Sequence, residues 1–417
     1  MSRNQSAPTG RIVPLSLGHA CVDIYQGAVA ALVPFLVIER SYTYAAASGV
    51  VLAATLLSSV VQPVFGMLAD KRTRPWLLPA SALLAGVGVA LVGVSGSYPL
   101  TLAFVAVSGI GVAAYHPEAA RLARLVSRGS HTAMGWFSLG GNVGFAAAPP
   151  LVAGAVAVGG LRASPLLVVP AIVGAALCVL ARPRGPGQHR DGLRRGQAAG
   201  TRTPHPPGLD DWVSFGKLSG AIVCRSIVFV GLSTFIALHA SQRTGWGMVS
   251  GTVALFVLYV GAAAGTVTGG ALADRYGRLP VVRWSYALTC LAVAGVVIVP
   301  GPPLYLFVAL ASAGLYVPFS LHLTLGQDYL PGRVGTAAGV TLGLAVSVGG
   351  VATPLVGALA DATSLRIALV PLAALPLVGW LFLRNLREPD VPGGPDAPGE
   401  SDAVSGDPRG GKRATIR

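Results

Sequence analysis

Three polar side chains lie close together in an otherwise apolar stretch near the start of the chain. His19 precedes Asp23 by four residues and Gln26 follows it by three, so a helix places all three on one face. At 1.5 Å per residue, Asp23 lies about 18 Å beyond Arg11, where the apolar stretch begins. A charge this deep in an apolar segment is costly unless it pairs or faces water. The three residues therefore predict the wall of a polar cavity, with a carboxylate that can carry a proton.

A second polar group follows between residues 115 and 121. Arg121 stands three residues after Glu118, within reach on one helix face. Glu118 is therefore either a proton carrier or half of a structural ion pair. His116 titrates near neutral pH, which suits a proton carrier, although packing would explain it equally well. Pro117 lies between His116 and Glu118 and removes one backbone hydrogen bond of the helix, because proline has no N–H.

The second half of the chain carries one deeply placed cation, Arg225. It lies eight residues past Lys217, about 12 Å into its apolar stretch. Its charge is opposite to that of Asp23, so the two can pair across the two halves of the chain. Asn142 and His322 are further candidates for the cavity lining.

These polar residues are exceptions in a very apolar chain. Of its 417 residues, 53% are hydrophobic and 11% are charged, against roughly a quarter charged in soluble domains. A run of about 20 apolar residues crosses the roughly 30 Å of a bilayer's hydrocarbon core. Twelve such runs are predicted, at residues 12–38, 45–69, 76–95, 99–126, 132–158, 162–182, 215–241, 248–273, 280–300, 303–329, 335–361 and 364–384.

Two polar segments divide the chain. Residues 183–214 are rich in Arg, Gly and Pro and separate the spans six and six. We expect an N-terminal six-helix bundle over residues 1–182, a cytoplasmic linker over 183–214 and a C-terminal six-helix bundle over 215–384. Residues 385–417 are predicted to be a disordered cytoplasmic tail.

The net charge of +14 reflects membrane topology and does not indicate nucleic-acid binding, because the basic residues lie in the breaks between apolar runs. Only Arg40, Arg162, Arg243 and Arg366 fall in loops on one side. The positive-inside rule makes the opposite side, with both termini, cytoplasmic. We expect a monomeric multi-pass protein of a bacterial cell (inner) membrane. Its expected partners are the lipid bilayer, protons and a small-molecule substrate, with no nucleic acid.

The two halves repeat one loop pattern after their second spans. The first copy consists of Gly66, Asp70, Lys71 and Arg74. The second copy, 204 residues later, consists of Gly270, Asp274, Arg275, Gly277 and Arg278. Glycine permits a tight turn, and an aspartate can accept arginine hydrogen bonds in one conformer and release them in another. The loops are therefore predicted to act as a conformational gate.

Spans five and eleven share a second pattern. Pro149 and Pro354 are 205 residues apart, and each follows a glycine by five residues, Gly144 and Gly349. Together with Gly135, these residues predict close helix packing and proline kinks.

The repeated G-x-x-x-D-[RK]-x-G-R loop resembles the signature of the major facilitator superfamily, although Thr73 stands where the family has glycine. The resemblance covers residues 12–384. It implies an all-α polytopic membrane protein of twelve transmembrane helices in two pseudo-symmetric six-helix bundles. It also implies transport by alternating access.

Other stretches resemble the branch related to fosmidomycin-resistance efflux proteins, namely residues 19–27, 115–121 and 329–336. This resemblance implies proton-coupled efflux of a drug or metabolite by an antiporter. The fifth span is also similar to a degenerate antiporter motif. One departure concerns the fourth span, where drug–proton antiporters carry an arginine four residues before a glycine. Here the glycine is Gly109 and the other position is Val105, so other residues must carry the proton.

Several alternatives stay open. A proton-coupled uptake symporter for a small organic anion or metabolite would use Arg225 to clamp its solute, and a non-transporting sensor would use the charged tail as its output. An enzyme is not expected, because the sequence has no His-Glu-x-x-His, nucleophile elbow or phosphate-binding loop. No cofactor or metal site is predicted, because the four cysteines lack metal-ligand spacing.

Overall fold

A computed structural model describes residues 9–71, 76–127, 131–181 and 210–389, and in these ranges the chain is helical without any strand. The first half contains α1 (Thr9–Arg40), α2 (Tyr44–Lys71), α3 (Leu77–Ala90), η1 (Val92–Val94), α4 (Tyr98–Ser127), α5 (His131–Gly159), η2 (Gly160–Val168) and α6 (Val169–Leu180). The second half contains α8 (Trp212–Thr244), α9 (Gly247–Tyr276), α10 (Arg278–Ile298), α11 (Leu304–Tyr316), α12 (Phe319–Tyr329), η3 (Pro331–Arg333), α13 (Val334–Ala362) and α14 (Leu365–Leu383).

The helices are long and apolar enough for a membrane. Ten stretches of the described residues meet the length and hydropathy of a membrane span. One of them, Ala133–Leu180, covers most of α5 together with η2 and α6, and α2 carries a shorter apolar stretch, Tyr44–Ser59. The chain is therefore an all-α polytopic membrane protein, and its helices fit the twelve predicted spans.

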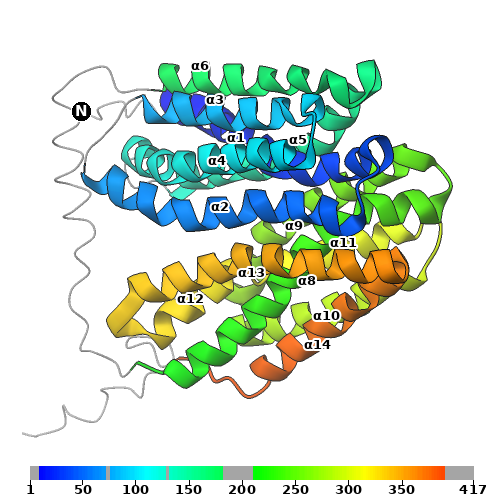
Figure 1. Ribbon diagram of the computed structural model, residues 1–417. Helices are drawn as coiled ribbons and strands as arrows, with labels where there is room; N and C mark the ends of the chain where they lie inside the picture. The colour runs from blue at the N-terminus through cyan, green and yellow to red at the C-terminus, as the bar shows by residue number, and fades with distance from the viewer. Residues whose placement is uncertain (1–8, 72–75, 128–130, 182–209, 390–417) are drawn as a thin grey trace, which may run out of the picture.

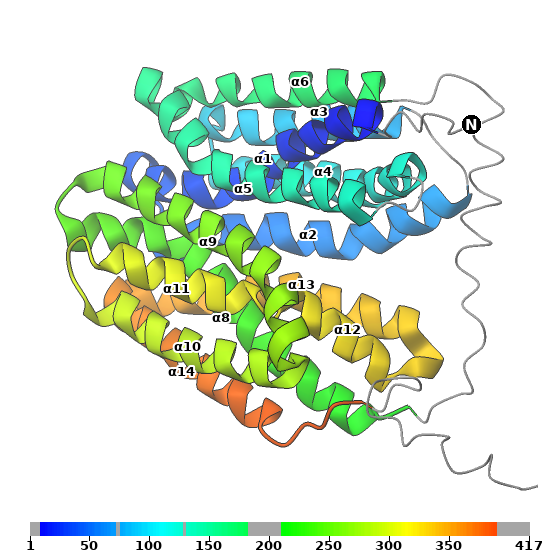
Figure 2. The same cartoon turned by 180° about the vertical axis from the view of Figure 1, so that it is seen from behind.

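The helices gather into two bundles, α1 to α6 and α8 to α14 (Figure 1). The bundles meet at the end where α2 begins and α13 ends, and they diverge toward the end where α12 lies. The view from behind shows the same arrangement (Figure 2). The predicted linker at 183–214 lies outside the described residues except for 210–214, and so does most of the predicted tail at 385–417.

Prolines shape several of the spans. Pro318 divides the predicted span 303–329 into α11 and α12, because proline provides no N–H for a continuous helix. The predicted span 162–182 begins as the 3₁₀ helix η2 and continues as α6. Pro149 and Pro354 lie within α5 and α13, which run through them.

Small residues bring the central helices of each half together. A Cβ added to Gly144 would overlap the carbonyl oxygen of Ala20, so α5 lies directly against the backbone of α1. In the second half, the N–H of Gly349 donates to the hydroxyl of Ser226 at 3.0 Å, which joins α13 to α8. An added Cβ at Gly135 meets nothing within 4 Å, so the structure gives this glycine no packing partner.

One carboxylate joins the two bundles where they meet. Asp361, at the end of α13, accepts hydrogen bonds from the N–H groups of Tyr44 and Ala45 at 2.7 and 2.9 Å. These N–H groups belong to the first turn of α2 and have no partner within the helix. A negative charge is also favoured at a helix N-terminus. We call this the Asp361 contact.

Candidate functional site

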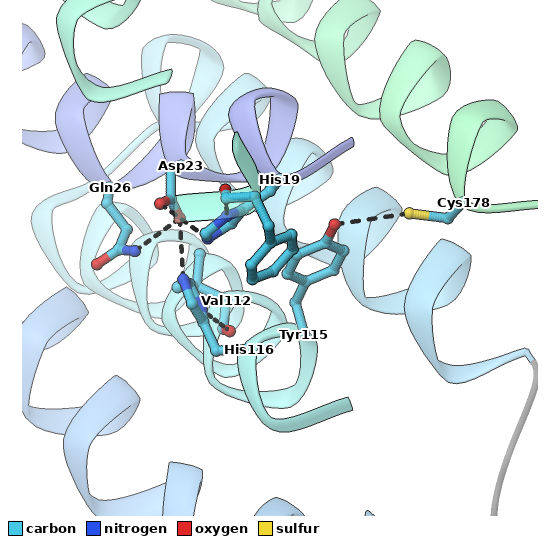
Figure 3. Close-up of polar contacts among 8 residues, drawn as sticks. His19, Asp23, Gln26, Val112, Tyr115, His116 and Cys178 are labelled. Atoms are coloured by element: carbon cyan, nitrogen blue, oxygen red, sulfur yellow. Dashed lines mark hydrogen bonds and ion pairs between the residues drawn. The ribbon is translucent and has the colours of Figure 1, made fainter. Parts of the chain in front are cut away.

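The structure surrounds Asp23 with nitrogen atoms from two helices (Figure 3). Its Oδ1 lies 3.0 Å from Nε2 of His116 on α4 and accepts a hydrogen bond from Nε2 of Gln26 at 3.0 Å. Its Oδ2 lies 3.2 Å from Nε2 of His19. Only 4% of the Asp23 surface is exposed. We call His19, Asp23 and His116 the His–Asp–His cluster.

Both histidines of the cluster are oriented by backbone carbonyl groups. Nδ1 of His19 lies 2.9 Å from the carbonyl oxygen of Phe137, and Nδ1 of His116 lies 2.9 Å from that of Val112. A carbonyl oxygen only accepts hydrogen bonds, so each Nδ1 carries a hydrogen. The remaining nitrogen of each ring, Nε2, therefore faces the carboxylate of Asp23.

This orientation gives the cluster two positions for a proton. The contact between Nε2 of His116 and Asp23 is attractive only with a hydrogen between the two atoms, so this contact is one position for a proton. Nε2 of His19 is buried at an ion-pair distance but makes no aligned hydrogen bond, so it is a second position for a proton. The three groups offer ligand atoms within 4.8 Å of one another, close enough to share one cation.

Several residues that the sequence did not single out hold the cluster in place. The rings of His19 and Phe137 stack with centroids 4.3 Å apart, and Tyr115 stacks on the same histidine at 6.2 Å. An added Cβ at Gly141 would lie 2.5 Å from Oδ2 of Asp23 and 2.8 Å from the ring of His19. The adjacent glycines 140 and 141 in the fifth span are the signal that could have revealed this close approach.

Glu118 and Arg121 form a separate ion pair on α4. Nε and Nη2 of Arg121 donate to the two carboxylate oxygens of Glu118 at 2.8 and 2.5 Å. This two-pronged geometry matches the planar guanidinium to the carboxylate. Glu118 is buried and does not join the cluster formed by its near neighbour His116.

The predicted pairing of Asp23 with Arg225 is wrong for this conformation. The oxygens of Asp23 are occupied within the first bundle, as described above, whereas Nη1 of Arg225 donates to the carbonyl oxygen of Leu315 at 3.1 Å. His322 lies on α12, with Nε2 3.5 Å from the hydroxyl of Tyr286. Sequence spacing could not predict that Asp23 and Arg225 lie apart, because the two residues belong to different helices.

Asn142 lies half-buried on α5, directly after Gly141. Adjacent residues of a helix point in different directions, and among the described residues no hydrogen bond joins Asn142 to the cluster.

The structure describes the second predicted gate loop in full but only part of the first. In the first loop, Gly66 lies on α2, whereas the side chains of Asp70 and Lys71 and the whole of Arg74 lie outside the described residues. The second loop turns between α9 and α10 at Gly277, whose φ of +83° favours glycine.

Arg278 is the best-anchored residue of the second loop. Its guanidinium reaches Asp328 and Glu388, each at 2.5 Å, and so ties α10 to the end of α12 and to the segment that follows α14. Arg275 lies over the ring of Tyr276, and Gly270 and Asp274 are exposed. These contacts lie within the second bundle.

Comparison with known proteins agrees with the helical membrane fold described above. The family model of the Major Facilitator Superfamily matches residues 15–354. The Fosmidomycin resistance protein of Escherichia coli (strain K12) is 31% identical over 390 residues, which cover 91% of this chain and 94% of that protein. The uncharacterized MFS-type transporter YfnC of Bacillus subtilis (strain 168) is 28% identical, with 90% and 94% coverage.

Solved structures share the fold at low sequence identity. A bacterial homolog of the human lysosomal transporter Spinster, in an inward-facing and occupied conformation, superposes with a TM-score of 0.73 at 16% identity and covers 89% of this chain and 95% of its own. The nucleoside transporter NupG superposes with a TM-score of 0.72 at 11% identity, covering 90% and 99%. By its sequence, its fold and its relatives, this chain belongs to the Major Facilitator Superfamily and is a membrane transporter, not an enzyme.

Proposed function

We propose that this transporter exports a drug or metabolite in exchange for protons, and that the His–Asp–His cluster carries the protons. The observation that most strongly supports this proposal is the orientation of both histidines, which places two proton positions against one buried carboxylate. Gln26 donates to Asp23 and the ring of Tyr115 stacks on His19, and neither side chain carries a charge at neutral pH. The relative named for fosmidomycin resistance supports export, because a transporter confers resistance by removing a drug.

The proposed cycle is alternating access between the two bundles. The Asp361 contact joins them at one end, and the ribbons diverge at the other. The basic loops favour a cytoplasmic location for the end at which the bundles diverge. A structure that opens toward the cytoplasm is an inward-facing conformer. We place it as a monomer in the bacterial inner membrane. A change in proton occupancy drives transport only if it shifts the balance between conformers.

The direction of flux tests this proposal. A susceptibility panel on cells with and without the protein identifies an exported compound, whose transport is then measured in inside-out membrane vesicles with an acidic lumen. A proton antiporter accumulates the compound in the vesicles, and collapse of the pH gradient stops accumulation. We expect a chelator to have no effect, because the proposed occupant of the cluster is a proton and not a metal ion. Gradient-driven loss of the compound from the vesicles would instead identify the alternative, an uptake symporter.

Gly141 gives a steric test of the cluster. We expect Gly141→Ala to lower gradient-driven accumulation by roughly tenfold, because the new methyl group displaces Asp23 or His19 and small misplacements of reacting groups are costly. Gly135→Ala, on the same helix and facing open space, is the matched control and should transport as wild type. Equal activity of the two variants would show that the cluster tolerates displacement and would contradict the proposed role.

The Asp361 contact gives a test of the conformational cycle. We expect Asp361→Ala to shift the population away from the joined state by roughly fivefold, because the charge at the α2 N-terminus contributes about 1 kcal/mol at an exposed site. Spin labels at the exposed positions 158 and 249, in a variant without the native cysteines, report the distance between the bundles at this end. Glu39→Gln is the control, because Glu39 accepts from the N–H of Leu161 within one bundle. A distance distribution unchanged by Asp361→Ala would count against the contact as a latch.

A further inference from the structure

Arg225 is a buried cation with no counter-charge among the residues that the structure describes. It lies on α8 with 3% of its surface exposed, and no carboxylate pairs with it in the part of the chain that the structure describes. Its Nη1 donates to the carbonyl of Leu315, whereas its Nε is buried without a hydrogen-bond partner. A charge buried in this way is strongly unfavourable unless another charge compensates it.

Aromatic rings surround the guanidinium without neutralising it. Its Cζ lies 5.5 Å from the ring centroid of Tyr316 and 5.2 Å from that of Phe319. Cation–π attraction of this kind stabilises an arginine. It leaves the net positive charge in place, so the site still favours an anion.

A second unpaired group borders the same space. Thr341, on α13, has 3% of its surface exposed, and its hydroxyl is buried without a partner. One small pocket is lined by both Arg225 and Thr341, together with Phe319 and His322. Buried polar groups in native structures normally have partners. Two unpaired groups facing one pocket therefore point to a ligand that supplies hydrogen-bond acceptors.

The pocket lies in the second bundle at a place that corresponds to the His–Asp–His cluster in the first. The repeated loops relate the halves by 204 residues, so α8 and the α11–α12 pair correspond to α1 and α4. Arg225 on α8 contacts residues 315, 316 and 319, as Asp23 on α1 contacts His116. The two halves thus place a buried carboxylate and a buried guanidinium in equivalent but separate positions.

We propose that Arg225 and Thr341 bind the anionic group of a small organic substrate, such as a carboxylate, phosphonate or phosphate, and that Tyr316 and Phe319 contact its apolar part. The proposal rests on the transport function and deepens it by naming the substrate class. Two small pockets flank Arg225, and neither has room for a water molecule in this conformation. The side chains that line them must therefore move apart for the anionic group to reach Arg225.

Binding of matched acidic and neutral probes tests the proposal. Thermal unfolding of the purified protein in a non-ionic detergent is measured with phenylphosphonate, benzoate and the neutral benzamide. We expect the two acids to raise the unfolding temperature and benzamide to have no effect. Arg225→Gln should weaken the acids' apparent affinity by at least roughly tenfold, which is the scale of a charge-assisted hydrogen bond, and Thr341→Val by a few-fold. Arg225→Lys should retain part of the effect.

The control is Arg243→Gln, since Arg243 lies on the same helix and donates to the carbonyl of Ile298 at 2.8 Å. It should bind the acids as wild type does. Acids that stabilise the protein no more than benzamide does, or an acid effect that survives Arg225→Gln, would overturn the proposal.

A measurement without ligand separates a binding role from a structural one. Removing an uncompensated buried charge is neutral or stabilising, so ligand-free Arg225→Gln should unfold at the wild-type temperature or above it. An arginine needed for folding would give a clear decrease, which would contradict the proposal. Binding is measured at equilibrium without a pH gradient, so loss of proton-driven export with intact acid binding would refute only the proposed function.

Discussion

Asp23→Asn should lower pH-gradient-driven accumulation in inside-out vesicles at least tenfold while leaving exchange of labelled for unlabelled compound in place. Asparagine keeps the shape of the side chain but removes the charge that both histidines face at 3.0 and 3.2 Å. Without this carboxylate, proton occupancy no longer changes the interactions between α1 and α4. Both histidines can be neutral beside asparagine. The variant therefore leaves no buried charge unpaired in the cluster and should fold.

Glu118→Gln is the discriminating control for this experiment. It removes the buried carboxylate on α4, whose two oxygens bind Arg121 and not the cluster. We expect this variant to keep its gradient dependence but to lose stability, because breaking a buried ion pair leaves Arg121 without its partner. The reverse result, with Asp23→Asn active and Glu118→Gln uncoupled, would move the proton site to Glu118.

Gly144→Leu should largely abolish recovery of folded protein. An added Cβ at this position overlaps the carbonyl oxygen of Ala20, and the obstacle is backbone that cannot rotate away. Overpacking a close helix contact costs about 1–3 kcal/mol or more, and here it forces apart the two helices that carry His19 and Phe137. Monodisperse yield in detergent and the unfolding temperature measure the effect.

Gly154→Leu is the matched control for this substitution. Gly154 lies on the same helix, is exposed, and has nothing within 4 Å of an added Cβ. Leucine there should face lipid and leave both yield and unfolding temperature unchanged. Similar behaviour of the two variants would mean that α1 and α5 adjust their distance freely.

Local spacing explains which parts of the site could be predicted. Asp23 and Gln26 are three residues apart, as are Glu118 and Arg121, and both pairs form hydrogen bonds in the structure. A helix fixes such neighbours regardless of its surroundings. The partner of His116, by contrast, depends on how α4 meets α1, and nothing in the local spacing specifies that contact.

The sequence by itself determined the membrane-spanning, all-helical character of this protein and its family, because apolar runs and repeated loop patterns are local properties of the chain. Only the tertiary structure decided which charges meet. It placed His116 on Asp23, aligned two imidazole rings through backbone carbonyls, and left Arg225 without a counter-charge among the described residues. The physical reason is that contacts between helices depend on crossing geometry and on close approach at positions such as Gly141 and Gly144. The proton site and the anion site proposed above both follow from these contacts.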